Sequence, residues 1–267
     1  MRDRISKCVL GASLLAFVPA QAGDVLSVAA FGEVRSSYLT RGAVVNKDPA
    51  AILWTKSRVN LPYGAYAGIW TWSVSAFSDS GQTAKRRYAF HENDFAPECG
   101  FVWTPVDRWS LDSAFSYRYV DLQGYDIQND LRHEFCFGQT LTNPYVTPYY
   151  LLRYAVHPMH WGYCNAGIRR KFALTESLSF TPQFFGDFGN GHHFASRYKM
   201  KGHGCALQAL NVKVTLDYAI NENLGVYVGF HELVIVDGRT RRALRESDRV
   251  ESLVDCAVFS VGLRANF

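Results

Sequence analysis

The strict alternation of side chains at the C-terminus constrains the fold more than any other feature of the sequence. Apolar residues occupy every second position from Ala257 to Phe267, whereas Ser260, Arg264 and Asn266 fall on the other parity. A period of two is that of a β-strand, because successive side chains of a strand point to opposite faces. The pattern predicts a terminal strand with one apolar and one polar face. The apolar series includes Phe259, Val261, Leu263 and Phe267.

The same alternation recurs along most of the chain. Trp109, Leu111 and Phe115 oppose charged and hydroxyl side chains, and in the first segment Leu26 shares a parity with Tyr38. Read in this way, the sequence contains twelve segments with strand character. They are 25–40, 50–61, 65–78, 89–103, 108–119, 131–141, 145–156, 161–173, 178–188, 204–219, 224–236 and 250–267.

The links between these segments differ in length in a regular way. Short links at 62–64, 105–107, 142–144, 175–177 and 220–223 alternate with longer ones at 41–49, 79–88, 121–129, 157–160, 189–203 and 237–249. This asymmetry is typical of outer-membrane barrels, which have short periplasmic turns and longer outer loops. Lipid offers the backbone no hydrogen-bond partner, so strands cross a membrane only in a closed barrel. We therefore predict an all-β fold, a transmembrane antiparallel barrel of about 12 strands.

Composition and the uncharged stretches argue against other classes. The 28 basic and 24 acidic residues give a net charge of +4, too small and too scattered for a nucleic-acid-binding protein. Residues 59–78 and 135–152 lack charge, but prolines and β-formers favour strands there over spanning helices. Aromatic residues near segment ends suit interfacial girdles. These are Trp54, Trp103, Trp109, Tyr145 and Trp161.

The N-terminus has the pattern of a secretory signal peptide. A basic start at Arg2, Arg4 and Lys7 precedes an apolar run, which ends in the small-residue motif Ala20-Gln-Ala22. The run is too short to span a bilayer. We expect cleavage after residue 22, which leaves a single barrel domain of residues 23–267 in the outer membrane of a Gram-negative-type envelope.

Two resemblances accompany this pattern. The segments Tyr38-Leu-Thr-Arg41-Gly42, Asp48-Pro49-Ala50 and Tyr63–Trp70 resemble the Y-x-x-R-G, P-A and Y-x-G-x-W motifs of the Gcw-type family of conserved hypothetical bacterial proteins. That resemblance covers about residues 28–100 and implies an outer-membrane barrel, but brings little function with it. The C-terminal strand resembles the signal that the barrel-assembly machinery reads, which implies that this machinery and outer-membrane lipids are partners.

The polar parity of the segments predicts the residues that line the lumen. Twelve strands enclose a space wider than an eight-stranded barrel but narrower than a sixteen-stranded porin. Either these charges pair across strands in a filled interior, or they line a narrow pore that favours small anionic solutes. The basic candidates are Arg35, Lys56, Arg58, Arg108, Arg118, Arg132, Arg153, Arg169, Lys171, Lys213 and Arg264. The acidic candidates are Glu33, Glu92, Asp94, Glu98, Asp112, Asp130, Glu134 and Asp187.

Signals for other activities are weak. His157, His160 and Cys164 have a loose metal-ligand spacing, and His192, His193 and His203 fall in another outer link, but exposed histidines are commonly just solvated. We find no catalytic motif and expect neither an enzyme nor a cofactor or metal. A lipid-modifying enzyme and a structural or surface-interaction barrel with an occluded lumen remain alternatives. The five cysteines after the signal peptide fall on non-neighbouring segments, so we expect them unpaired. They are Cys99, Cys136, Cys164, Cys205 and Cys256.

Overall fold

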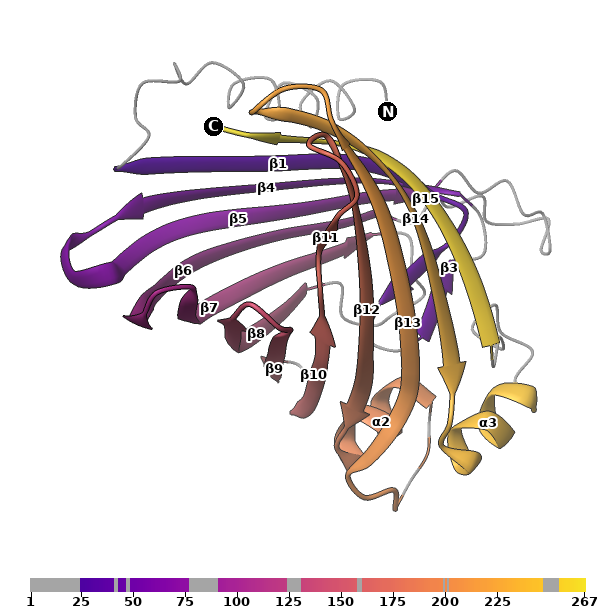
Figure 1. Ribbon diagram of the computed structural model, residues 1–267. Coiled ribbons are helices and arrows are strands. Elements are labelled where there is room, and N and C mark those ends of the chain that lie inside the picture. The colour runs from indigo at the N-terminus through magenta and orange to yellow at the C-terminus, as the bar shows by residue number, and fades with distance from the viewer. Residues whose placement is uncertain are drawn as a thin grey trace, which may run out of the picture.

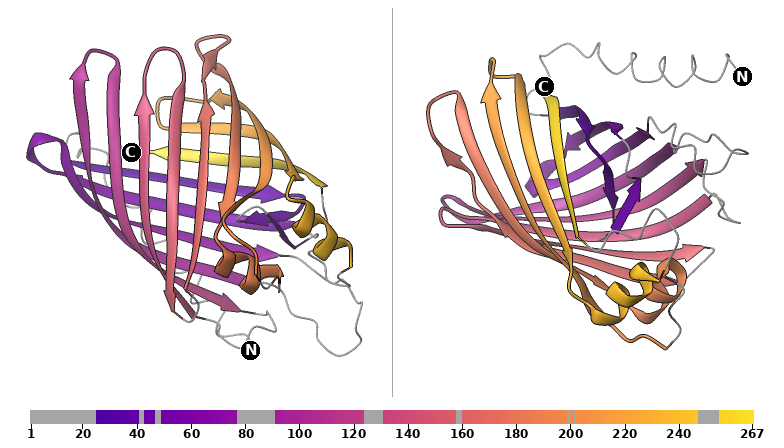
Figure 2. Two further views of the ribbon diagram at one scale, coloured as in Figure 1. Left: turned by 90° about the horizontal axis from the view of Figure 1, so that it is seen from below. Right: turned by 90° about the vertical axis from the view of Figure 1, so that its right-hand side faces the viewer.

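The computed structural model describes residues 25–40, 43–46, 49–76, 91–123, 131–157, 160–198, 200, 202–246 and 255–267. Its strands form one antiparallel sheet that closes on itself, because β1 pairs with β15 and β10 pairs with β12. Figures 1 and 2 show the resulting barrel. The expected signal peptide, residues 1–22, lies outside the described residues.

Twelve strands form the wall within the described part of the chain, as the alternation predicts. They are β1 (Leu26–Arg35), β4 (Ala50–Asn60), β5 (Ala65–Ala76), β6 (His91–Val106), β7 (Trp109–Gln123), β8 (Leu131–Thr142), β9 (Thr147–His157), β10 (Trp161–Arg169), β12 (Leu178–Gly189), β13 (Ala206–Ala219), β14 (Leu224–Ile235) and β15 (Asp255–Asn266). The remaining elements are β2 (Tyr38–Thr40), β3 (Ala43–Asn46), η2 (Pro62–Gly64), β11 (Phe172–Ala173), α2 (Gly191–Tyr198) and α3 (Gly238–Arg245).

The links are short at one end of the barrel and long at the other. The C-terminal Asn266 pairs with Ala29 near the start of β1, so the first and last wall strands meet at the short-turn end. One short turn requires its glycine. Gly64 has φ 82°, and a Cβ there would lie 2.2 Å from the carbonyl oxygen of Val102. The helices α2 and α3 lie at the end with long links (Figure 1).

The first wall strand ends earlier than the predicted segment, 25–40. The wall strand β1 stops at Arg35, and the chain bends at Ser36 and Ser37 before β2, which pairs only with β3. Ser36 is fixed to β15 because its backbone N–H donates to the carbonyl of Phe259, and its Oγ accepts from the Phe259 N–H. The chain then enters the barrel (Figure 2). Tyr38, which the parity assigned to the apolar outer face, is only 1% exposed.

The inserted strand β2 bridges two clusters of buried side chains. Tyr38 packs with Ile52, Val74 and Val120. Leu39 packs on the other side with a second cluster, which comprises Ala209, Leu233, Ile235, Leu244 and Val258. The end of the lumen with long links is therefore narrowed by the chain itself.

The outer face of the wall is apolar. Phe259 and Leu263 are each 63% exposed, and Val261 and Phe267 lie on the same face. The predicted girdle residues Trp103 and Tyr145 are also exposed. No helix among the described residues is long and apolar enough to cross a membrane.

Candidate functional site

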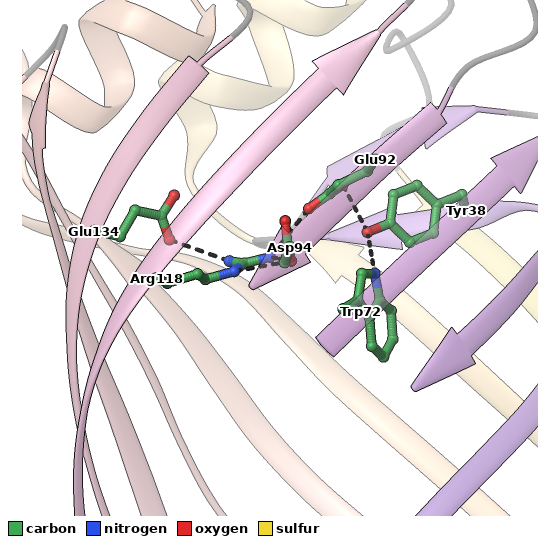
Figure 3. Close-up of polar contacts among 6 residues, drawn as sticks. All are labelled: Tyr38, Trp72, Glu92, Asp94, Arg118 and Glu134. Carbon is green, nitrogen blue, oxygen red and sulfur yellow. Dashed lines mark hydrogen bonds and ion pairs between the residues drawn. The ribbon is translucent and has the colours of Figure 1, made fainter. Parts of the chain in front are cut away.

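Arg118 lies at the centre of a buried ionic cluster on the inner wall (Figure 3). Its guanidinium donates to Glu92 at 3.0 Å, to Asp94 at 2.9 Å and to Glu134 at 3.1 Å. All four side chains are buried. Strand alternation places them there, because β6, β7 and β8 each direct even-numbered residues inward. One cation therefore serves three carboxylates, so the cluster has no positive charge to offer a solute.

The same cluster anchors the inserted strand. The Tyr38 hydroxyl donates to the second carboxylate oxygen of Glu92 at 2.9 Å, and the Trp72 indole N–H donates to that hydroxyl at 3.3 Å. Figure 3 shows this chain of contacts from β2 through β5 to the β6–β8 wall. A buried polar chain of this kind fixes the geometry because each group depends on its neighbours for hydrogen bonds.

A second network lies further toward the short turns on the same side. Glu98 accepts from Lys56 Nζ at 2.9 Å and from Arg58 Nε at 3.1 Å. Arg58 also donates to Asp112 at 3.2 Å, and the Tyr66 hydroxyl donates to Asp112 at 2.7 Å. Here the basic side chains of β4 are engaged by carboxylates two and three strands away, on β6 and β7.

The strands around the β1–β15 seam hold two more pairs. Arg35 binds Glu33, which also accepts a 2.8 Å hydrogen bond from the Tyr227 hydroxyl. Arg264 donates to Asp217 at 2.7 Å. Asp217 was not among the predicted lumen residues, although its parity on β13 matches that of Lys213 and indicates the inner face.

On the far side of the lumen, Asp187 is buried but bound by neutral donors. Asn165 and Asn211 each donate to it at 2.8 Å, and the Tyr163 hydroxyl also contacts it. Asn211 Oδ1 in turn lies 2.9 Å from His231 Nε2. The hydrogen-bond donors of this carboxylate are thus neutral, and Arg153 acts on it electrostatically without forming an ion pair.

Three basic side chains on this far side remain without a carboxylate partner. Among the described residues, no carboxylate forms an ion pair with Arg153, Arg169 or Lys213, and the buried Nε of Arg153 has no hydrogen-bond partner. Arg169 lies over the ring of Tyr149 at 5.8 Å. Arg153 borders both a cavity of 390 Å³ and one of 220 Å³.

Most predicted lumen residues lie on inner-face positions. These are Glu33, Arg35, Lys56, Arg58, Glu92, Asp94, Glu98, Asp112, Arg118, Arg132, Glu134, Arg153, Arg169, Asp187, Lys213 and Arg264. The assignment of Arg108 to the lumen is wrong, because this residue lies in the β6–β7 turn with φ 64° and its side chain is 77% exposed beside Asp107. Lys171 is likewise exposed in the link after β10. Asp130 lies outside the described residues.

The aromatic lining was missed by sequence reasoning. Trp54 and Trp161 were assigned to the interfacial girdles, but Trp54 borders the 390 Å³ cavity and Trp161 is only 4% exposed. Parity was the available signal, because Trp54 shares its parity with Lys56 and Arg58. A girdle assignment made from position near a segment end ignores which face the side chain occupies.

The histidines and cysteines do not assemble into a metal site within the described residues. His193 is buried against Gln208 at 2.9 Å, whereas His203 stacks on Phe194 and lies 3.2 Å from Asp237. The side chain of His157 is outside the described set. All five described cysteines are free thiols.

Asp237 has a separate role at the start of α3. Its carboxylate accepts from the backbone N–H and the hydroxyl of Thr240, each at 2.6 Å, which caps the helix. Burial by itself raises the pKa of Asp237, but the hydrogen bonds from Thr240 and His203 outweigh it and lower the pKa below its ordinary value.

Comparison with known proteins identifies the fold. No family model and no curated sequence matches the chain. The NanC porin is similar in structure at a TM-score of 0.53 and 10% identity, over 89% of this chain and 98% of that one. An outer membrane channel from Pseudomonas putida F1 is similar at a TM-score of 0.53 and 8% identity, over 94% of this chain and 99% of that one. The chain has the barrel fold of these channels.

Proposed function

We propose that the protein is an outer-membrane barrel whose lumen is a narrow passage for small anionic solutes. Export through a cleaved signal peptide, insertion by the barrel-assembly machinery and contact with outer-membrane lipids belong to the same proposal. The fold shared with outer-membrane channels, the apolar outer face and the C-terminal strand support it. Gcw-type membership stays a prediction. The proposal assigns no catalytic step to the chain.

The observation that carries the anion preference is the set of basic side chains without partners. Arg153, Arg169 and Lys213 face the lumen and form no ion pair with a described carboxylate. The ion pairs around Glu98 and at the β1–β15 seam balance in charge, and the carboxylates in excess, around Arg118 and at Asp187, are buried. None of the three basic side chains is buried, so these are the charges that a solute meets. A cationic lining of a narrow pore attracts anions and repels cations.

The inserted strand supports a second candidate, a barrel with an occluded lumen that serves a structural or surface-binding role. Tyr38 and Leu39 bridge clusters on opposite sides of the barrel, and this contact narrows the passage at the end with long links. The two candidates differ in one measurable property, because only the first conducts ions.

Single-channel conductance in a planar bilayer tests the proposal. Refolded 23–267 is expected to give discrete steps, and its reversal potential in a KCl gradient is expected to show anion preference. Lys213→Met should reduce that preference, whereas the matched variant Arg108→Met should not, because Arg108 is exposed in a turn. Silence from a folded, heat-modifiable barrel would overturn the channel and favour the occluded candidate.

A further inference from the structure

A row of aromatic side chains crosses three neighbouring strands on the inner wall. Phe31 of β1 pairs in register with Trp54 of β4, and Trp54 pairs with Trp72 of β5. The rings of Phe31 and Trp54 stack at 5.2 Å between centroids, and Trp72 meets Phe31 edge-on at 5.9 Å. All three are only partly buried and border the 390 Å³ cavity. The row presents apolar ring surface to the cavity.

The cavity continues this apolar surface on its other sides. Trp70 lies next to the row, and Leu39 and Leu151 contribute aliphatic surface. Aromatic surface facing a lumen gains free energy when an apolar group covers it. Binding pockets for small molecules combine such a lining with a few polar groups that fix orientation.

Four basic side chains border the same cavity, and three are already engaged. Arg35 binds Glu33, Lys56 binds Glu98, and Arg118 binds the three carboxylates around it. Arg153 differs, since it has no ion pair among the described residues and its buried Nε lacks a hydrogen-bond partner. A guanidinium offers planar donors that match a carboxylate.

We propose that this cavity binds an aromatic monocarboxylate. The ring lies against the row of Phe31, Trp54 and Trp72, and the carboxylate binds the guanidinium of Arg153. This inference rests on the proposed function and names the class of solute that the passage selects. One unengaged cation at the cavity matches one negative charge.

The polar groups at the cavity are already hydrogen-bonded within the protein, which favours a ligand with an aromatic ring over one with a sugar ring. Glu98 is occupied by Lys56 and Arg58, and the hydroxyl of Tyr38 is occupied by Glu92 and Trp72. Hydroxyl groups of a sugar would lose hydrogen bonds to water without regaining them here, which is costly. An aromatic ring has no such hydrogen bonds to lose.

Calorimetric titration of the refolded barrel in detergent tests the site independently of conductance. Benzoate is expected to bind saturably and at least about tenfold more tightly than acetate, benzyl alcohol or glucuronate, since each of these lacks the ring or the charge or adds hydroxyls. Arg153→Met should weaken benzoate binding by about tenfold or more, and Trp54→Leu should weaken it while leaving the weak affinity for acetate unchanged.

The matched control is Arg108→Met, which removes an exposed cation in the β6–β7 turn that does not border this cavity. Its benzoate affinity should equal that of the unaltered barrel, and Arg153→Lys provides a second variant if Arg153→Met does not refold. Equal affinity for acetate, tighter binding of glucuronate or unchanged affinity in both Arg153 variants would overturn the site. Binding without conductance would overturn the channel alone, and conductance without binding would overturn the site alone.

Discussion

Basic side chains have carboxylate partners on one side of the lumen and lack them on the other. On the first wall, formed by β4 to β8, the basic side chains Lys56, Arg58 and Arg118 are all bound by carboxylates of the same wall. On the second wall, formed by β9, β10, β12, β13 and β14, Arg153, Arg169 and Lys213 have no described ionic partner, and Asp187 is bound by neutral donors. In the proposed channel, the second wall is therefore the one whose charges are available to a solute.

The electrostatic field in the lumen is therefore directed from one wall to the other, and not along the barrel axis. Charges on the first wall are held in ion pairs a few ångströms apart, and the two carboxylates in excess around Arg118 are buried. The single charges on the second wall act over about a Debye length of 8 Å at physiological salt. The inserted strand β2 lies between the walls and touches both, through Tyr38 and Leu39. Substitutions that perturb one region at a time should separate the roles of the two walls, with effects that range from large to small.

Removal of the central cation of the first wall should have the largest effect. Arg118→Met leaves Glu92, Asp94 and Glu134 facing one another in a buried site. We expect the free energy of unfolding to fall by about 3–5 kcal/mol, as for other broken buried ion pairs. Urea unfolding of the barrel in vesicles, followed by heat-modifiable gel migration, measures this, and an unchanged midpoint would contradict the assigned pairing.

Loss of the hydroxyl that fixes β2 to the first wall should have a smaller effect. Tyr38→Phe keeps the ring in its cluster but removes a hydrogen bond to the ionised Glu92. We expect a loss of about 1.5–3 kcal/mol in the same unfolding assay. Tyr117→Phe is the matched control, because that hydroxyl bonds His133 with no carboxylate involved, and should lose about 1 kcal/mol. Equal losses would show that Glu92 does not anchor β2.

The helix cap beside the second wall predicts a local, pH-dependent effect. Because the pKa of Asp237 is lowered in the folded state, its contribution is complete above the unfolded pKa and is lost as pH falls through the folded value. Asp237→Ala should destabilise α3 by about 1 kcal/mol near neutral pH. Hydrogen exchange of the α3 amides should show this difference near pH 7, and the difference should shrink as the pH falls below 3.8, the ordinary pKa of an aspartate side chain. A difference that persists in acid would contradict the cap.

Neutralisation of a carboxylate on the first wall should leave basic side chains there without an ionic partner, as on the second wall. Glu98→Gln releases Lys56 fully and Arg58 in part. A unit charge about 5 Å from an ion in water contributes about 0.8 kcal/mol, so the permeability of anions should rise about fourfold and that of cations should fall by a similar factor. Reversal potentials in a KCl gradient measure the ratio of the two permeabilities. No change would mean that ions do not pass close to the first wall.

The periodicity of the sequence predicted most of the wall. Alternation is local, so it identified the twelve strands, the outer face that carries Phe259 and Leu263, and the inner-face charges. The girdle assignment of Trp54 was wrong because it ignored this alternation, whereas two other errors fall where alternation stops being informative. Arg108 lies in a tight turn at a positive φ, and Tyr38 follows a bend that Ser36 fixes by bonding to β15, more than 200 positions away in the sequence.

The sequence by itself therefore determined the architecture, the positions of the short and long links, and the set of charges that face inward. Only the tertiary structure decided which of those charges pair, because pairing depends on strand register and on closure between β1 and β15. It also decided that Phe31, Trp54 and Trp72 form one row and that β2 enters the lumen. These contacts join residues far apart in the chain, and no periodicity within one strand encodes them.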